Sequence, residues 1–289
     1  MTSYLIVGGG ELIRAGEPVE AGLLSELAPS RKAKVGYELL CELLYRPLAH
    51  LVVLALLPLR VAPPLVAASA GATGIAAAVE LARGHLVLTA LLVQLKTVLD
   101  NADGKLARLS GRVTVFGRYL DSELDLFVNA ALFAAVGWAT GRWMPAAAGF
   151  VALTFVLNAD YNAERLYRLE RGLDAAGTPE ATGRADRLLR GLYLALYAPQ
   201  DRLVERFVEW RLRDAGPQAR LLYHDCGTVA VLAQLGMSSQ LAAFGLCLVL
   251  GDPLAFLWLA LAELAVVALL ALRKELLMRT VPNLKEEAL

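Results

Sequence analysis

The sequence predicts an all-α, polytopic membrane protein with six transmembrane helices and an N-terminal interfacial amphipathic helix. Apolar residue types make up 57% of the 289 residues and the mean hydropathy is +0.52, both above the values of a typical soluble domain. The apolar residues gather in runs long enough to cross a bilayer, which takes roughly 20 helical residues. The 28 Lys and Arg residues balance the 28 Asp and Glu residues, so the net charge does not indicate a partner. We expect a lipid bilayer around the chain and no nucleic-acid partner.

The chain before the first long apolar run predicts a separate cytoplasmic segment, residues 1–34. The stretch IVGGGE at 6–11 predicts a flexible turn, because it does not complete the G-x-G-x-x-G pattern of a nucleotide-binding loop. Residues 35–60 are apolar on most faces but are interrupted by Arg46 and Pro47. This pattern favours a helix that lies in the membrane interface, with a seventh span over the same residues as the alternative.

Six further segments are predicted to cross the bilayer: 63–82, 86–108, 117–139, 144–164, 226–249 and 253–272. The connections at 82–85, 140–143 and 250–253 are tight turns that contain Gly or Pro and few cations. The other connections and both tails hold most of the remaining Lys and Arg. Because cytoplasmic loops carry an excess of these residues, the pattern places both termini on the cytoplasmic side of the cell membrane.

A long charged stretch, 165–222, separates the fourth and fifth predicted spans. Leucine and aromatic residues recur every three or four positions from 188 to 212 beside Arg and Glu, which predicts amphipathic helix after a break near Gly172–Gly183. This helix either packs on the membrane face or on a partner, or it extends the neighbouring spans and packs against them. We interpret it as a cytoplasmic helical insertion in a membrane domain of residues 35–275, which a cytoplasmic tail, 276–289, follows.

Four aspartates stand at helical spacing where the second predicted span ends and the third begins: Asp100, Asp103, Asp121 and Asp125. Each pair lies on one face of its helix, and roughly 21 Å of helix separates each pair from the far end of its span. The two pairs therefore reach the same depth, near the cytoplasmic boundary. Buried carboxylates need cations nearby. Salt bridges with the Lys and Arg residues between the pairs are one explanation, and a hard divalent metal such as Mg²⁺, Mn²⁺ or Ca²⁺ is the other.

The residues between the two pairs favour a nucleotide diphosphate site. Gly104 follows Asp103 directly, Ala107 lies one turn further on, and Gly117 opens the next helix. Glycine is a poor residue for a helix interior, and it lets a flat or bulky group approach the backbone. Arg108 adds a planar fork that matches a phosphate group.

At fixed spacing, these residues read D-x2-D-G-x2-A-R-x8-G-x3-D-x3-D from Asp100 to Asp125. This string resembles the signature of the CDP-alcohol phosphotransferase (CDP-alcohol phosphatidyltransferase) family at every fixed position. The span layout extends the resemblance more loosely over 35–275. Two features that are frequent in that family are missing: an Asn in the first span, which reads APPLVAAS at 62–69, and an Arg after the last aspartate, where Leu126 stands.

The resemblance implies a transferase of phospholipid biosynthesis. It would move a phosphoalcohol group, most simply phosphatidyl, from a CDP-alcohol such as CDP-diacylglycerol to an acceptor hydroxyl and release CMP. Asp100, Asp103, Asp121 and Asp125 would gather around two divalent cations, Mg²⁺ or Mn²⁺. Asp125 would also take the proton from the acceptor, which is a polar or phosphorylated alcohol.

The resemblance also implies the nucleotide contacts. Gly104, Ala107 and Gly117 would face the cytidine, Arg108 the phosphates, and Thr114 would add a hydroxyl contact. Asp100 would reach the nucleotide through the cations. The family further leads us to expect a homodimer.

Several other residues carry weaker expectations. A phosphorylated acceptor needs cations near Asp125, which Arg112 and Arg118 can supply. Lys96 can pair with Asp100, and Glu123 is expected to point away toward solvent or a neighbouring Arg. Further candidates for acceptor contact are Asp160, Glu164, His224 and Asp225.

Two other classes remain as alternatives at this point. An aspartate-rich membrane prenyltransferase also uses Mg²⁺ and a diphosphate donor, and a transporter can carry an intramembrane carboxylate relay. The first leaves the Gly104 and Ala107-Arg108 positions unexplained, and the full set of spacings argues against the second.

Overall fold

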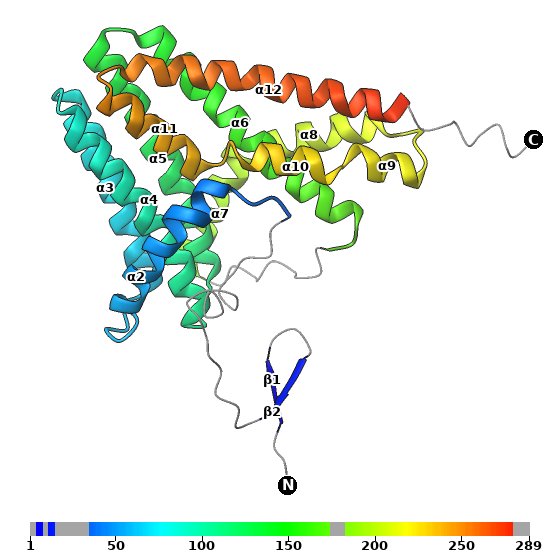
Figure 1. Ribbon diagram of the computed structural model, residues 1–289, viewed down its shortest axis with the longest axis horizontal. Helices are drawn as coiled ribbons and strands as arrows, with labels where there is room; N and C mark the ends of the chain where they lie inside the picture. The colour runs from blue at the N-terminus through cyan, green and yellow to red at the C-terminus, as the bar shows by residue number, and fades with distance from the viewer. Residues whose placement is uncertain (1–3, 8–10, 15–34, 174–182, 280–289) are drawn as a thin grey trace, which may run out of the picture.

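The computed structural model describes residues 4–7, 11–14, 35–173 and 183–279 (Figure 1). Near the N-terminus, β1 (Tyr4–Val7) and β2 (Glu11–Arg14) pair as an antiparallel hairpin, with Tyr4 opposite Arg14. Apolar and β-branched residues that flank a Gly-rich turn favour such a hairpin. The all-α prediction holds for the membrane part of the chain, but it did not include these two strands. The glycines of the turn and most of the predicted 1–34 segment lie outside the described residues.

The described part of the chain contains helices that are long and apolar enough to cross a membrane, so this is a polytopic membrane protein. The five candidates are α3 (Pro63–Ala82), α5 (Val115–Thr140), α6 (Trp143–Glu170), the run from α9 to α11 (Pro217–Val249) and α12 (Pro253–Arg279). The remaining predicted span forms the helix α4 (Leu86–Leu109). Its charges at Lys96, Asp100 and Asp103 exclude it from that set. Five of the six predicted spans therefore meet the criteria of length and composition.

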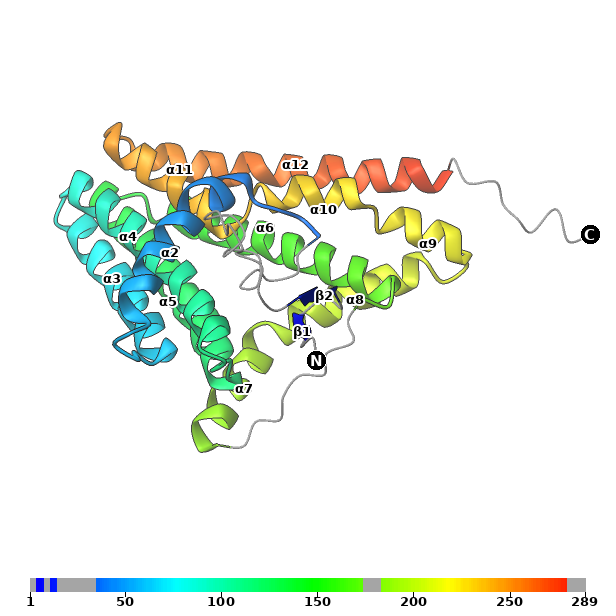
Figure 2. The ribbon, with the colours of Figure 1, turned by 60° about the horizontal axis from the view of Figure 1, so that its bottom comes forward.

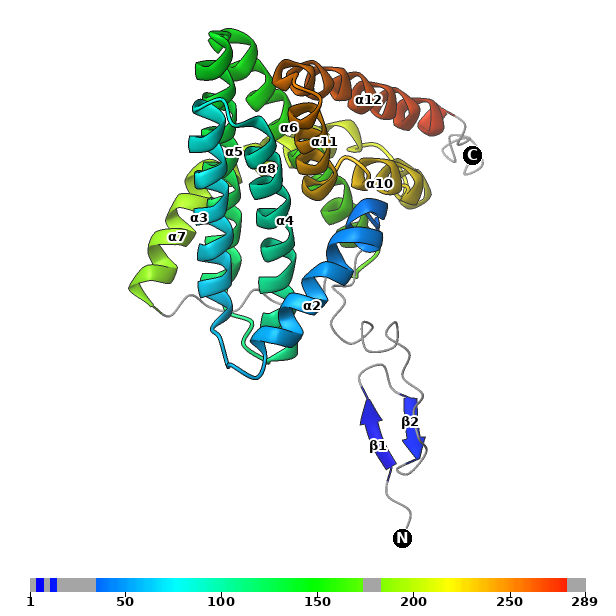
Figure 3. The same cartoon turned by 60° about the vertical axis from the view of Figure 1, so that its left-hand side comes forward.

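The helices α3, α4 and α5 stand side by side (Figure 3), and α3 contacts both of the others. Small residues on α3 permit this close approach. A Cβ atom on Gly71 would lie 2.8 Å from Leu124 Cδ2, and one on Gly74 would lie 2.5 Å from Val128 Cγ1. Since α4 and α5 carry the four aspartates, α3 fixes the two acidic pairs relative to each other.

The predicted helix at 35–60 is confirmed and contains a local irregularity. Residues Cys41–Tyr45 form a π-helical turn, η2, which continues into α2 (Arg46–Leu56). Pro47 has no N–H and crowds the carbonyl one turn before it, so the preceding turn widens. One face of α2 packs on α4. The continuous helical run covers residues 39–56 and is not among the five candidate spans, so the structure gives no support to a seventh span.

The fifth predicted span, 226–249, is broken in its middle. It consists of α10 (Cys226–Ala233) and α11 (Met237–Val249), which run in different directions (Figure 1). The buried Gln240 side chain donates to the Leu235 carbonyl at the break, 3.2 Å away, and to Glu263 Oε2 on α12, 2.6 Å away. Because the helix is interrupted, the residues at 236–238 reach the cavity described below instead of packing inside a continuous span.

The charged stretch after α6 is helical, as predicted, and packs on the bundle. It contains α7 (Arg184–Leu196), α8 (Ala198–Arg211) and α9 (Pro217–Tyr223). Contacts join α7 to α5 and α8 to α6, and Figure 2 shows both helices beneath the bundle. An ion pair between Arg211 and Glu275 ties α8 to α12. The stretch is therefore part of the same body as the spans.

Candidate active site

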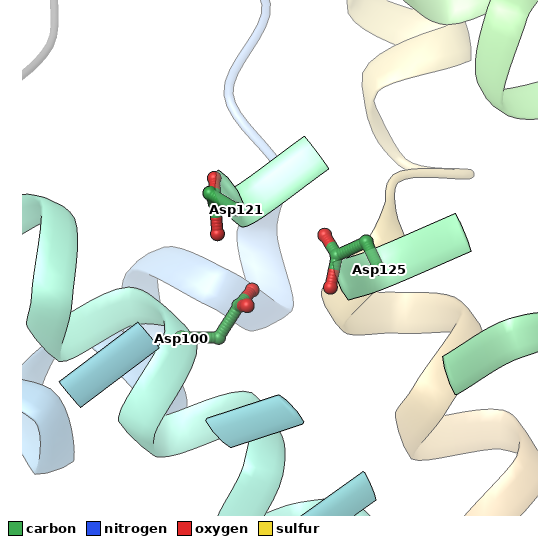
Figure 4. A group of neighbouring side chains, drawn as sticks. All are labelled: Asp100, Asp121 and Asp125. Atoms are coloured by element: carbon green, nitrogen blue, oxygen red, sulfur yellow. The ribbon is translucent and has the colours of Figure 1, made fainter. Parts of the chain in front are cut away.

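Three of the four predicted aspartates converge between α4 and α5. One carboxylate oxygen from each of Asp100, Asp121 and Asp125 lies within 4.8 Å of the other two, and Figure 4 shows the three side chains pointing toward one another. Asp121 and Asp125 lie one turn apart on α5, so both face α4. Asp103 is buried and lines the same cavity, but it does not belong to this group of three.

The aspartates line a cavity of about 800 Å³, which is within the size range of small-molecule sites. Its walls come from α4, α5, α6, the N-terminal helix, the junction of α7 and α8, and the break between α10 and α11. Among the described residues, the polar side chains of its wall include Glu38, Glu42, Arg46, Asp100, Asn101, Asp103, Lys105, Arg108, Asp121, Ser122, Asp125, Asn129, Asn158, Asp160, Tyr197, Gln200, Asp201 and Ser238.

A lysine supplies the cation that these carboxylates contact within the protein. Lys96 Nζ donates to Asp100 Oδ1 at 3.1 Å and also contacts Asp125, and its side chain is 3% exposed. The expected pairing of Lys96 with Asp100 is confirmed. The cations between the two acidic pairs are the other proposed partners: Lys105, Arg108, Arg112 and Arg118. Of these, Arg112 is exposed on the connection between α4 and α5, and Arg118 is exposed in the first turn of α5. One ammonium group cannot balance the charge of three ionised carboxylates.

The donor set therefore fits a hard divalent cation. Asp100, Asp121 and Asp125 offer only carboxylate oxygens, which are the ligands that Mg²⁺ and Mn²⁺ prefer. A cation here would also offset the mutual repulsion of the three groups. The cluster is compatible with metal binding on this chemistry.

The two signature glycines are not explained by packing. Among described atoms, a Cβ on Gly104 would meet only Arg108, at 3.3 Å from Nη1, and one on Gly117 would meet only Thr114 Oγ1, at 3.2 Å. Gly74, by contrast, has no room for a Cβ. Gly104 lines the cavity and the Arg108 guanidinium lies beside it. The open space at Gly104 therefore belongs to the cavity.

The other predicted nucleotide residues occupy the ends of the same two helices. Thr114 is the N-cap of α5, where its Oγ1 accepts from the Gly117 N–H at 3.0 Å. Ala107 is half-buried on α4. Ala107, Thr114 and Gly117 are not among the residues that line the cavity, and neither are Arg112 and Arg118.

The weaker acceptor candidates are spread over different places. Asp160 lines the cavity. Glu164 accepts from the Val35 N–H at 3.4 Å, and His224 is buried. Asp225 caps α10 and pairs with Arg273 at 2.8 Å. Of these candidates, the structure brings only Asp160 to the cavity.

The environment of the Glu123 side chain differs from the prediction. It is 2% exposed, so the predicted solvent contact is wrong, because α7 packs against α5 and shields this face from water. Neither of its carboxylate oxygens has a hydrogen-bond partner within the described ranges.

Sequence reasoning missed the residues that close the far side of the cavity. The Tyr197 hydroxyl, at the start of α8, donates to the Ser122 carbonyl on α5 at 3.0 Å. Burial raises the pKa of the Tyr197 phenol, so this group stays a neutral donor. Asn162 on α6 donates to Asp201 Oδ1 at 3.0 Å. No local pattern indicates these contacts, because they join segments that are far apart in the sequence.

Comparisons with known proteins agree with the signature. The model of the CDP-alcohol phosphatidyltransferase family matches residues 53–203, just over half of the 289 residues. A phosphatidylinositol phosphate synthase of Corynebacterium glutamicum is 36% identical over 98 residues, which are 34% of this chain and 43% of that protein. A bifunctional IPC transferase and DIPP synthase of Rubrobacter xylanophilus is 35% identical over 85 residues, 29% of this chain and 20% of that protein.

These matches span less than half of the length of the curated relatives. Among solved structures, the Mycobacterium tuberculosis phosphatidylinositol phosphate synthase with CDP-DAG bound aligns over 74% of this chain and 94% of that chain, at 18% identity and a TM-score of 0.32. The family match removes the support for a prenyltransferase or a transporter. This chain belongs to the CDP-alcohol phosphatidyltransferase family.

Proposed function

We propose that this protein transfers a phosphatidyl group from CDP-diacylglycerol, or a related group from another CDP-alcohol, to an acceptor hydroxyl and releases CMP. The observation that carries the proposal is the convergence of Asp100, Asp121 and Asp125 at a cavity that also contains Gly104 and Arg108. Acidic side chains for a metal, an Arg for phosphate and an open backbone for a base together form a site for a cytidine diphosphate.

In this proposal, the donor contacts residues at which packing within the protein leaves free space. The cytidine would lie against Gly104, and the family resemblance assigns Ala107, Gly117 and the Thr114 hydroxyl to the same nucleotide. Arg108, whose guanidinium lies beside Gly104, binds a phosphate oxygen through its planar fork.

Two divalent cations, Mg²⁺ or Mn²⁺, complete the site in this proposal. Asp100, Asp121 and Asp125 would hold them, and Asp103 would join from the same cavity wall. When bound, such cations neutralise the charge on the diphosphate and on the leaving CMP.

Asp125 acts as the base. It accepts the proton of the acceptor hydroxyl, whose oxygen then forms a bond to the phosphorus next to the donor alcohol. The bond between that phosphorus and the oxygen of CMP breaks, and CMP leaves with the electron pair. Asp125 lines the cavity, and its contact with Lys96 fixes the position of the carboxylate there.

The acceptor is a polar or phosphorylated alcohol. The name of the Corynebacterium relative describes a product that carries an inositol phosphate, which supports a phosphorylated polyol among the candidates. Arg112 and Arg118 are the proposed contacts to such an acceptor. Their exposed positions let them meet a substrate that arrives from water.

The helix α4 is proposed as the sixth span. Its charged side is turned into the protein, since Lys96 is 2% exposed and Asp103 7%, whereas Leu91 and Leu95 are 63% and 48% exposed. A helix with this arrangement presents hydrocarbon to lipid and keeps its charges inside. With α4 included, the span count keeps the active site and both termini on the cytoplasmic side, and the membrane domain occupies 35–275. The protein is proposed to act as a homodimer.

Release of CMP by the full-length protein tests this proposal. The purified protein is given CDP-diacylglycerol and Mn²⁺ with glycerol phosphate, inositol phosphate, serine or inositol in turn. Asp125→Asn is expected to abolish turnover while the Kd for CDP-diacylglycerol stays within about threefold, because this change removes the base but keeps the shape. If none of these acceptors gives metal-dependent release of CMP, the proposed function is wrong. If Asp125→Asn loses donor binding as much as turnover, Asp125 is not the base.

A further inference from the structure

A second charged part of the cavity lies beyond the three aspartates. It is formed by Arg46 on α2 and by Lys105 and Arg108 on α4, all of which line the cavity. Lys105 and Arg108 are three positions apart, so they lie on neighbouring parts of one helix surface. The N-terminal helix packs along α4, so Arg46 lines the same cavity as the two cations of α4.

Lys105 is the unusual member of this cation cluster. It is 5% exposed, yet within the described ranges no carboxylate forms an ion pair with it. Arg46, in contrast, pairs with Glu42 at 2.7 Å. An ammonium group that opens onto a cavity without a counter-charge is unfavourable, and two further cations in the same cavity wall add to that cost.

A ligand that supplies negative charge explains why this arrangement is kept. An Arg fork beside a Lys point charge is a common pattern for binding phosphate. The cluster also lies in the same cavity as Gly104 and the aspartates, so a phosphate that reaches it belongs to the same bound substrates.

We infer that Arg46, Lys105 and Arg108 form a phosphate-binding subsite of the cavity, in which the buried Lys105 ammonium is the anchor. This inference rests on the proposed function and deepens it, because it assigns Lys105 and Arg46 to a substrate. The phosphate belongs either to the diphosphate of the CDP donor or to a phosphorylated acceptor. Both sources share the dianionic group that three cations recognise.

Lys105→Met tests the subsite, because methionine keeps the length of the side chain without its charge. Lys105→Arg keeps the charge, and Arg213→Met is the matched control, since Arg213 is an exposed cation between α8 and α9 that does not line the cavity. The ligand-free Lys105→Met protein is expected to unfold at a higher temperature than wild type, because a buried unpaired charge is gone. A structural role for Lys105 would instead lower that temperature.

Binding and turnover are then measured on each full-length variant. The Kd for CDP or the KM for inositol phosphate is expected to rise about tenfold or more in Lys105→Met, to stay within about threefold in Lys105→Arg, and to stay unchanged in Arg213→Met. A change in the CDP Kd assigns the donor diphosphate to the subsite, and a change in the acceptor KM assigns the acceptor phosphate.

Two outcomes separate this inference from the proposed function. If wild type releases CMP and Lys105→Met changes neither value, the subsite is refuted and the proposed function stands. If wild type releases no CMP but its thermal stabilisation by inorganic pyrophosphate disappears in Lys105→Met, the subsite stands and the proposed function fails.

Discussion

The variant Gly104→Ala tests whether this glycine is needed for ligand binding or for packing of the helices. Among the atoms that the structure describes, the added methyl group would meet only Arg108, whose Nη1 lies 3.3 Å from the Cβ position. A flexible Arg head can move by the few tenths of an ångström required. Alanine is favoured over glycine in a helix interior by about 1 kcal/mol. The variant is therefore expected to be as stable as wild type or up to about 1 kcal/mol more stable.

The same methyl group occupies the space that we assign to the nucleotide. We expect the Kd for CDP in the presence of Mn²⁺ to rise at least about tenfold, which corresponds to about 1.4 kcal/mol. Thermal unfolding of the purified protein, measured over a series of CDP concentrations, gives both the ligand-free stability and the Kd. Stability and binding thus change in opposite directions.

Gly74→Ala is the matched control, because it adds the same group to a glycine that packing requires. Its Cβ would lie 2.5 Å from Val128 Cγ1, so we expect a loss of about 1–3 kcal/mol of stability from overpacking and a smaller effect on the Kd. A CDP Kd within twofold of wild type in Gly104→Ala would refute the assignment of this glycine to the ligand.

Three further predictions concern the charges and the far wall of the cavity. Lys96→Met leaves three facing carboxylates without their internal cation, so the metal-free protein is expected to lose about 3 kcal/mol of stability. Mn²⁺ is expected to stabilise this variant against heat more than it stabilises wild type. Equal stabilisation of both proteins would show that Lys96 does not offset this charge. Chelation of divalent ions is expected to stop CMP release, and Mg²⁺ or Mn²⁺ to restore it, since the site offers only carboxylate oxygens; activity that persists in excess chelator would contradict the metal site. Tyr197→Phe removes the hydrogen bond to the Ser122 carbonyl and is expected to destabilise the protein by about 1 kcal/mol, as judged by the unfolding midpoint; no change would mean that the bond is replaced by water.

The acidic site could be predicted because its parts are local. Asp100 and Asp103 share one helix, Asp121 and Asp125 share the next, and a tight connection of known length joins the two helices. Helical periodicity and rise then determine that the pairs meet. The pairing of Lys96 with Asp100 follows from the same spacing of four residues.

The rest of the cavity could not be predicted, because it depends on packing between distant segments. Tyr197 reaches Ser122 only after the charged stretch folds back along α5 and α6. At the break before Met237, the Glu38 carboxylate packs against Gly236, where a Cβ would lie 2.8 Å from Glu38 Oε2. Glu38 comes from the other end of the chain, so periodicity within 226–249 predicts one continuous span. The environment of Glu123 was misjudged for the same reason.

The order of charges along α4 connects the two halves of the site. Asp100 belongs to the carboxylate cluster and pairs with Lys96. Lys105 and Arg108, which follow Asp100 by one to two turns of α4, belong to the cation cluster. Without substrate, each cluster is a concentration of like charge that the protein itself only partly offsets. In the proposed function, a divalent cation would offset the first and a phosphate would offset the second, and a diphosphate bound to the cation could reach both clusters. Binding of the metal and of the donor should therefore be coupled, because each supplies the opposite charge that the other needs.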